Sequence, residues 1–137
     1  LTTYLGRRRH LAEAMASQDK WIVSKAERQG PNFMIQGGGA EQTKLVMAEI
    51  WRKGIFERYD AEFIAPIHDE VVFSVSDKDK FACMREVHTC MTRKYLPLVP
   101  TLSMSSIGKN FAQQEEVSEV FDADAIQRVC DKALAEA

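Results

Sequence analysis

A short segment near the middle of the chain, Phe63 to Val75 (FIAPIHDEVVFSV), constrains the fold most. Two arms rich in apolar and β-branched residues flank a polar centre made of His68, Asp69 and Glu70. Such arms favour β-strands, whereas Asp and Glu are poorly suited to strand interiors. The segment therefore predicts a β-hairpin that presents an imidazole and two carboxylates at its tip. These side chains suit a metal ion, a phosphate chain that carries metals, or a proton to be transferred.

The N-terminal half of the chain predicts two helices. The first should run from Trp21 to Gln29 and end there, because the following Gly30–Pro31 pair disfavours helix. The second should follow the glycines at 37–39 and continue to about Lys53. Helical spacing predicts that its apolar side consists of Leu45, Met47, Ala48, Ile50 and Trp51, and that its solvated side consists of Glu41, Lys44, Glu49, Arg52 and Lys53.

The C-terminal half adds a helix, a strand and a second helix. Apolar residues at three- and four-residue steps predict a helix over 81–95, which Pro97 should stop. Residues 99–107 predict a third strand, and residues 120–137 predict an amphipathic helix. This order of elements indicates an α+β fold, in which a small antiparallel sheet with the hairpin packs against amphipathic helices.

Composition indicates one domain that is not exported. The 137 residues, 45% of them apolar, can form one core, and the chain has neither a secretory leader nor a run of 18 apolar residues. We therefore expect no membrane contact. Cys83, Cys90 and Cys130 lack CxxC spacing, so reduced thiols are expected. Because the chain begins at Leu1, we expect a processed product or a piece of a longer protein.

Charge is distributed unevenly along the chain. Residues 1–58 hold ten Lys and Arg against six Asp and Glu, a net +4, whereas residues 59–137 hold eight against fourteen, a net −6. The densest basic cluster is Arg7, Arg8 and Arg9, directly after Gly6. The front half could thus face a polyanion, although three arginines on a turn can also serve only solubility.

Four short motifs resemble those of one family and occur in its order. They are GRR at 6–8, AERQGPNFMIQG at 26–37, IHDE at 67–70, and LVP at 98–100 with IGKNF at 107–111. Together they resemble the GRRR, AER…N…QG, VHDE and VP…GxNW motifs of the family A DNA polymerases, the group of bacterial polymerase I and related phage and mitochondrial enzymes. The resemblance covers roughly residues 3 to 112. It implies the C-terminal palm portion, with adjoining fingers elements, of a DNA-directed DNA polymerase.

The resemblance implies a catalytic role for the hairpin tip. Asp69 would be one of two aspartates that hold two Mg²⁺ ions in the complete enzyme, and Glu70 would be a nearby, less essential carboxylate. Hard oxygen ligands suit Mg²⁺, which in phosphoryl transfer activates the attacking 3′ hydroxyl and stabilises the leaving pyrophosphate. His68 would lie beside the primer terminus.

The resemblance also implies DNA contacts for five other residues. The amides of Asn32 and Gln36 can meet minor-groove acceptors that every base pair presents in nearly the same place. Arg28 would contact the template or nascent duplex, and Arg7 and Arg8 would lie near the DNA or support that surface. Without the resemblance, an ion pair at the helix end with Glu27 or another acidic residue would explain Arg28 equally well.

Some features depart from the family pattern. Gly30 and Pro31 predict a bent approach to Asn32, and Pro66 predicts one unpaired or distorted position in the first hairpin arm. The motif of the second catalytic aspartate is missing, as is the fingers helix that binds the incoming nucleotide. We therefore expect an inactive chain that acts only with the N-terminal part of the polymerase, on primer-template DNA and deoxynucleoside triphosphates. The expected location is the cytoplasm of a bacterium or of a virus-infected host cell.

The resemblance divides the chain into three parts. Residues 1–58 would be a helical fingers and palm segment that contacts DNA, residues 59–112 the palm hairpin, helix and strand, and residues 113–137 a helical extension. Two alternatives stay open. The chain could be a non-catalytic nucleic-acid-binding module on a polymerase scaffold, or an interaction domain whose polar tip is merely solvated and whose C-terminal helix docks a partner.

Overall fold

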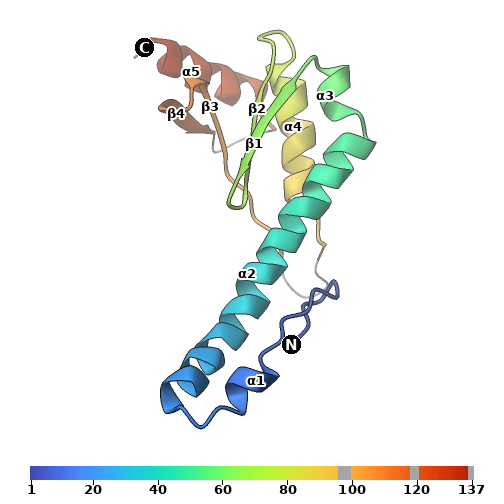
Figure 1. Cartoon of the computed structure of the whole chain (residues 1–137). Coiled ribbons are helices and arrows are strands. Elements are labelled where there is room, and N and C mark those ends of the chain that lie inside the picture. Colours follow the sequence, from blue (N-terminus) through green and yellow to red (C-terminus); the bar gives the residue numbers. More distant parts are fainter. Residues whose placement is uncertain (96–99, 118–120, 136–137) are drawn as a thin grey trace.

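A single long helix organises the molecule. In the computed structural model, which describes residues 1–95, 100–117 and 121–135, this helix carries a broad lobe of strands and helices at its C-terminal end (Figure 1). The lobe contains two antiparallel hairpins, and the fold is α+β as the sequence predicts. The elements in chain order are α1 (Ala12–Met15), α2 (Lys20–Arg52), α3 (Ile55–Arg58), β1 (Glu62–Ile67), β2 (Glu70–Ser74), α4 (Lys80–Met91), β3 (Ser105–Asn110), β4 (Gln113–Val117) and α5 (Ala123–Ala135).

Helix α2 continues through the positions where the sequence predicts a break. Pro31 and the glycines at 37–39 all lie inside it, so the prediction of two shorter helices is wrong. A residue before proline avoids the helical region partly because its Cβ meets the proline ring. Gly30 has no Cβ, so the helix can pass through the Gly30–Pro31 pair.

The first nine residues form a tight antiparallel turn that packs along α2, and we call it the N-terminal turn. Thr2 and Arg8 form an isolated antiparallel β-bridge. A Cβ atom at Gly37 would lie only 3.1 Å from Thr3 Cγ2, and one at Gly30 would lie 3.2 Å from Leu1 Cδ1. Glycine at these two positions therefore lets the turn approach the helix closely.

The main core lies where the C-terminal half of α2 meets α3, α4 and the first hairpin. Its fully buried members are Val46, Ile50, Ile55, Cys83, Val87 and Cys90. The predicted apolar side of α2 is only partly correct, because Trp51 is 75% exposed and Ala48 is also exposed. Glu41 and Glu49, which were expected in solvent, are buried instead. Both carboxylates contact polar groups from distant segments, described below.

The predicted hairpin is present as β1 and β2. Ile67 pairs with Glu70, so His68 and Asp69 form a two-residue connection. The register shifts between Phe63 and Ala65, which leaves one extra residue in β1. The expected distortion of this arm is therefore present, two residues before Pro66, and Pro66 itself stays in register with Val71.

The remaining elements differ more from the predictions. Helix α4 ends at Met91 rather than near Tyr95, and Pro97 lies outside the described residues, as do Leu98, Val99 and Val120. The predicted strand over 99–107 is shifted, since β3 begins at Ser105 and pairs with β4, a strand that the sequence did not predict. Its residues, QQEEV, lack the apolar alternation that marks a strand.

The predicted C-terminal helix is present as α5. With Met84 and Val117, its residues Ile126 and Cys130 form a second core. All three cysteines are free and buried, as expected.

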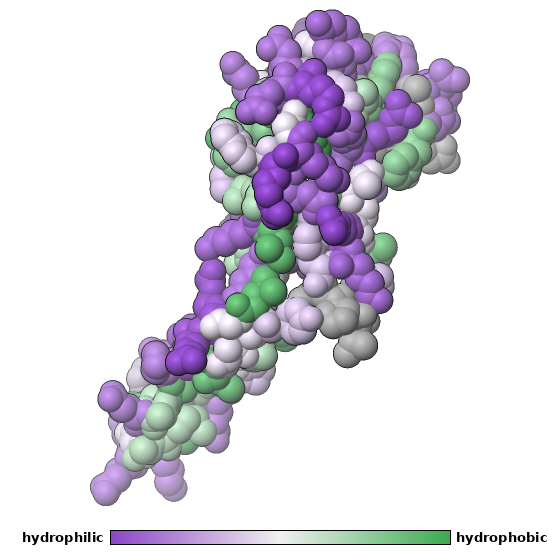
Figure 2. Space-filling model, turned by 90° about the vertical axis from the view of Figure 1, so that its right-hand side faces the viewer, coloured by the Kyte–Doolittle hydropathy of each residue, from purple (hydrophilic) through white to green (hydrophobic). Residues whose placement is uncertain are grey.

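Large hydrophobic side chains remain exposed on this chain. The most exposed are Leu102 at 90%, Met104 at 79% and Trp51 at 75%. Figure 2 shows hydrophobic atoms along the narrow part of the molecule, below a broad lobe whose visible surface is mostly hydrophilic. No helix in the described parts of the chain is long and apolar enough to span a membrane.

Candidate functional site

The tip of the first hairpin presents three polar side chains to solvent. His68, Asp69 and Glu70 are all exposed, and among the described residues none of their side chains forms a hydrogen bond or an ion pair. His68 has φ of 55°, in the left-handed region that residues other than glycine seldom adopt. Strain of this kind tends to occur at functional sites. Both carboxylates at the tip are therefore available to an external ligand.

The tip offers ligands of the type that Mg²⁺ prefers, but too few of them for a complete site. Carboxylate oxygens are hard donors and suit Mg²⁺. Within the described residues there is no group of three or more His, Cys, Asp or Glu side chains that could hold a metal ion. Asp69 and Glu70 could thus supply part of a metal coordination shell, and the other ligands would have to come from outside the described residues.

Helix α2 places Arg28, Asn32 and Gln36 on one exposed face. The three residues are spaced by four, which brings their side chains to one side of a continuous helix. Arg28 donates to Ser24 Oγ at 3.1 Å, and it forms no ion pair with Glu27. The amides of Asn32 and Gln36 have no hydrogen-bond partner among the described residues. This face is therefore open to a ligand.

Nearer the C-terminal end of α2, the same side of the helix faces the broad lobe that contains the first hairpin. Because an α-helix has about 3.6 residues per turn, Arg28 and Val46 are separated by about five full turns, and so are Asn32 and Ile50. Val46 and Ile50 point into the core beside the hairpin. Figure 1 shows that the hairpin tip is directed toward the N-terminal half of α2. Arg28, Asn32 and Gln36 therefore share one side of the molecule with the hairpin tip.

The structure does not bring Arg7 and Arg8 to this face. The N-terminal turn packs against Gly37, which lies nine residues, or about two and a half turns, from Arg28. Arg7 and Arg8 consequently occupy the opposite flank of α2. Arg9 is exposed, and its guanidinium donates to Gln29 Oε1 at 3.2 Å.

A buried carboxylate that sequence analysis placed in solvent joins α2 to the segment after α4. Glu49 Oε1 accepts from Arg93 Nη1 at 2.6 Å and Lys53 Nζ at 2.9 Å, and its Oε2 accepts from Tyr95 Oη at 2.6 Å. These donors, above all the Tyr95 hydroxyl, lower the pKa of Glu49 to about 2. Only Lys53, one turn away, could be paired with Glu49 from sequence spacing.

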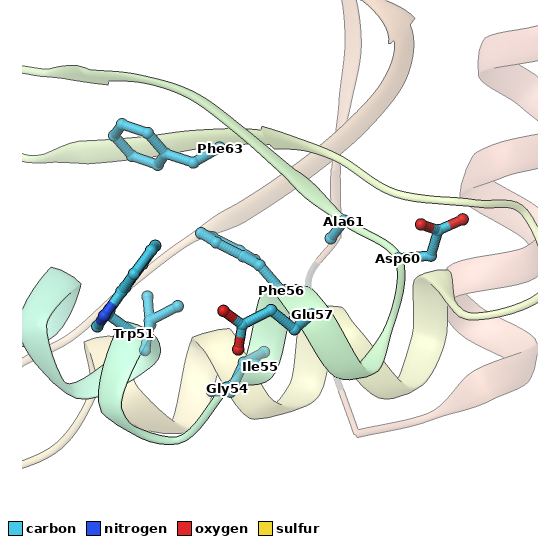
Figure 3. Close-up of a pocket in the computed structure, with 9 residues that line it drawn as sticks. Trp51, Gly54, Ile55, Phe56, Glu57, Asp60, Ala61 and Phe63 are labelled. Carbon is cyan, nitrogen blue, oxygen red and sulfur yellow. The ribbon is translucent and has the colours of Figure 1, made fainter.

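A pocket formed by the end of α2, α3 and β1 lies away from the hairpin tip. Trp51, Phe56 and Phe63 line it, and Glu57 contributes a carboxylate at its edge (Figure 3). Phe63 stands near the start of β1, whereas His68 follows its end. The pocket is thus at the base of the hairpin, at the other end from its tip.

Comparison with known sequences identifies the family. The sequence model of DNA polymerase family A matches residues 1–113. This chain belongs to DNA polymerase family A. The match confirms the family inferred from the motifs and agrees with the extent expected for it. It ends at the start of β4, so most of β4 and all of α5 lie beyond it.

Individual family A proteins show how much of a polymerase the chain spans. It is 27% identical over 114 residues to the thermostable DNA polymerase I of Thermus aquaticus, covering 83% of this chain and 13% of that protein. It is 30% identical to DNA polymerase I of Bacillus caldotenax, covering 73% and 11%, and 30% identical to a DNA-directed DNA polymerase of Pseudomonas phage M6, covering 71% and 13%.

A solved structure supports the same relationship. The polymerase domain of Pol1 from M. smegmatis, in complex with a DNA primer-template and dNTP, matches with a TM-score of 0.67 and 30% identity. The match covers 74% of this chain and 18% of that chain. The chain therefore corresponds to a small part of a family A polymerase.

Proposed function

We propose that this chain is the C-terminal palm portion of a DNA-directed DNA polymerase, which adds nucleotides to a primer 3′ end. One observation carries the proposal: the hairpin that holds the tip carboxylates packs on the side of α2 where helical spacing places Arg28, Asn32 and Gln36. A polymerase must bring metal-binding carboxylates and a DNA-contacting surface to the same primer end.

In this proposal Asp69 is a metal ligand and Glu70 supports it. Two Mg²⁺ ions, bound in the complete enzyme, would supply the activation of the 3′ hydroxyl and the stabilisation of the leaving pyrophosphate. The tight turn keeps the Asp69 carboxylate at the extreme end of two paired strands. His68, the first residue of that turn, is the group placed to contact the primer terminus.

Helix α2 supplies the DNA contacts. The amides of Asn32 and Gln36, which have no partner among the described residues, can donate to minor-groove acceptors, which differ little between base pairs. Arg28 adds a positive charge on the same face for the template or nascent duplex. Arg7 and Arg8 serve a separate stretch of the nucleic acid, because they lie on the other flank of the helix.

The chain acts together with the remaining N-terminal part of the polymerase. The tip lacks a complete set of metal ligands among the described residues, and the exposed Trp51, Leu102 and Met104 are suited to cover by a further protein surface. Residues 1–58 form the fingers and palm helical segment, residues 59–112 the palm hairpin, helix and strand, and residues 113–137 an extension. A cytoplasmic location without membrane contact follows from this role.

Primer extension tests the proposal. This chain alone, with Mg²⁺, deoxynucleoside triphosphates and primer-template, should not extend the primer. In a complete polymerase that contains it, Asp69→Ala should abolish extension and leave primer-template affinity within about twofold. Glu62→Ala is the matched control, because Glu62 is an exposed carboxylate at the other end of β1. Extension that survives Asp69→Ala would favour a non-catalytic nucleic-acid-binding module instead.

A further inference from the structure

The buried carboxylate of Glu41 connects α2 to the N-terminal turn. Glu41 is only 8% exposed, and its Oε1 accepts a hydrogen bond of 2.6 Å from Thr3 Oγ1. Thr3 Oγ1 in turn accepts from the backbone N–H of Arg7 at 3.0 Å. A hydroxyl has one proton, and here it is donated to the carboxylate while a lone pair accepts from Arg7. The hydroxyl thus links the helix to the turn.

The side chain of Arg7 faces the same carboxylate. Its Nε lies 3.6 Å from Glu41 Oε1, and the Arg7 side chain is 41% exposed. Among the described residues, its two terminal nitrogens have no partner. A guanidinium is planar, so contact through Nε leaves the terminal nitrogens directed elsewhere, as a pair of donors that matches a phosphate.

The buried carboxylate of Glu41 lowers the stability of the fold unless its negative charge has a function. Glu41 Oε2 is buried and has no hydrogen-bond partner among the described residues. A buried charged oxygen without a donor destabilises a fold, and a neutral glutamine could keep the hydrogen bond from Thr3 at lower cost. The feature that only a carboxylate supplies here is the negative charge opposite Arg7.

We propose that Glu41 is a positioning residue that holds Arg7 for a DNA phosphate, on the flank of α2 opposite Arg28, Asn32 and Gln36. The inference rests on the proposed function, since it assumes that this chain binds DNA. Thr3 holds the backbone of Arg7, the Glu41 carboxylate lies against its Nε, and the terminal nitrogens bind the phosphate. Without the carboxylate the long side chain would have to be ordered at each binding event, which weakens binding.

The test compares Glu41→Gln with Glu13→Gln in DNA binding by the 137-residue chain. Glu13 is exposed and without a partner among the described residues, so both variants lose one negative charge. Loss of a negative charge should by itself strengthen binding to DNA. We expect Glu13→Gln to bind a primer-template slightly more tightly, and Glu41→Gln to bind it about three- to tenfold more weakly, as judged by fluorescence anisotropy.

Salt dependence and a double mutant separate positioning from a purely structural role. Glu41→Gln and Arg7→Ala should each reduce the slope of log affinity against log salt by about 0.9, the value for one phosphate contact. The double variant should bind no more weakly than Arg7→Ala alone. If Glu41 has only a structural role, Glu41→Gln should lower thermal stability and leave the slope of log affinity against log salt unchanged.

Several outcomes would overturn the inference. Glu41→Gln binding as tightly as Glu13→Gln, or an effect additive with Arg7→Ala, would each do so. If circular dichroism shows that Glu41→Gln does not fold, Thr3→Val removes the linking hydroxyl with little change of shape and should reproduce the weaker binding and smaller slope. If these variants have no effect while Arg28→Ala abolishes binding, the proposed function stands and the inference fails. If the unmodified chain does not bind DNA, both fail.

Discussion

Replacing Glu49 by glutamine should destabilise the fold in a pH-dependent way. The ordinary pKa of the carboxyl is 4.5, and Tyr95, Lys53 and Arg93 lower it to about 2 in the folded chain. This difference corresponds to roughly 3 kcal/mol of stability at neutral pH. The Lys53 and Arg93 side chains are 45% and 61% exposed, so water screens their charges and we expect about 1–2 kcal/mol.

The pH dependence has a definite sign. A carboxyl whose pKa is depressed in the folded state contributes its full stabilisation above the unfolded pKa, and the contribution is lost as the pH falls through the folded pKa. The difference between Glu49→Gln and the parent chain should therefore be constant above about pH 5.5, be roughly halved by pH 3 and nearly vanish at pH 2.

Urea denaturation at several pH values measures this difference. The m-value should not change, because the surface exposed on unfolding is the same. Glu57→Gln provides the control, since Glu57 is exposed and has no ion pair among the described residues, and its stability should match the parent. Equal stability of Glu49→Gln and the parent at pH 7, or a loss that does not depend on pH, would refute the assignment of Glu49 as a buried anion held by three donors.

Further predictions concern backbone geometry. Gly108→Ala should cost about 2 kcal/mol or more in chemical denaturation, because a Cβ there would overlap the Gln113 carbonyl oxygen and separate β3 from β4. Gly38→Ala should instead stabilise by about 0.5–1 kcal/mol, since Gly38 lies inside α2 with no atom in the way. If both variants change the free energy of unfolding in the same direction, the backbone geometry described for these two glycines is wrong. His68→Gly should raise the melting temperature by relieving the left-handed backbone at φ 55°, and an unchanged or lower value would contradict that strain.

Features that depend on neighbouring residues could be predicted from the sequence. The hairpin was identifiable because its strands, turn and polar tip all lie within Phe63 to Val75. The three- and four-residue steps of Phe81, Met84 and Val87 likewise predicted α4. The tip side chains lie at the end of the hairpin, where they were expected.

Features that depend on distant residues could not be predicted. The burial of Glu41 depends on Thr3, 38 residues away, and that of Glu49 depends on Arg93, 44 residues away. The sharing of one side by Arg28 and the hairpin tip required α2 to be continuous, which the Gly30–Pro31 pair obscured. Strand β4 was missed because its stabilisation comes from pairing with β3 and not from its own polar residues.

The length of α2 has a consequence for the insertions and deletions that this chain can tolerate. Gly38, Gly39 and Ala40 lie between Gln36 and the core residue Val46, and a Cβ added at either glycine would have no other atom within 4 Å. Substitution there should be inexpensive. One inserted residue, however, would rotate Arg28, Asn32 and Gln36 by about 100° around the helix axis relative to the hairpin, whereas seven inserted residues would nearly restore their direction. This stretch of α2 should therefore tolerate substitutions of its residues but not most insertions or deletions.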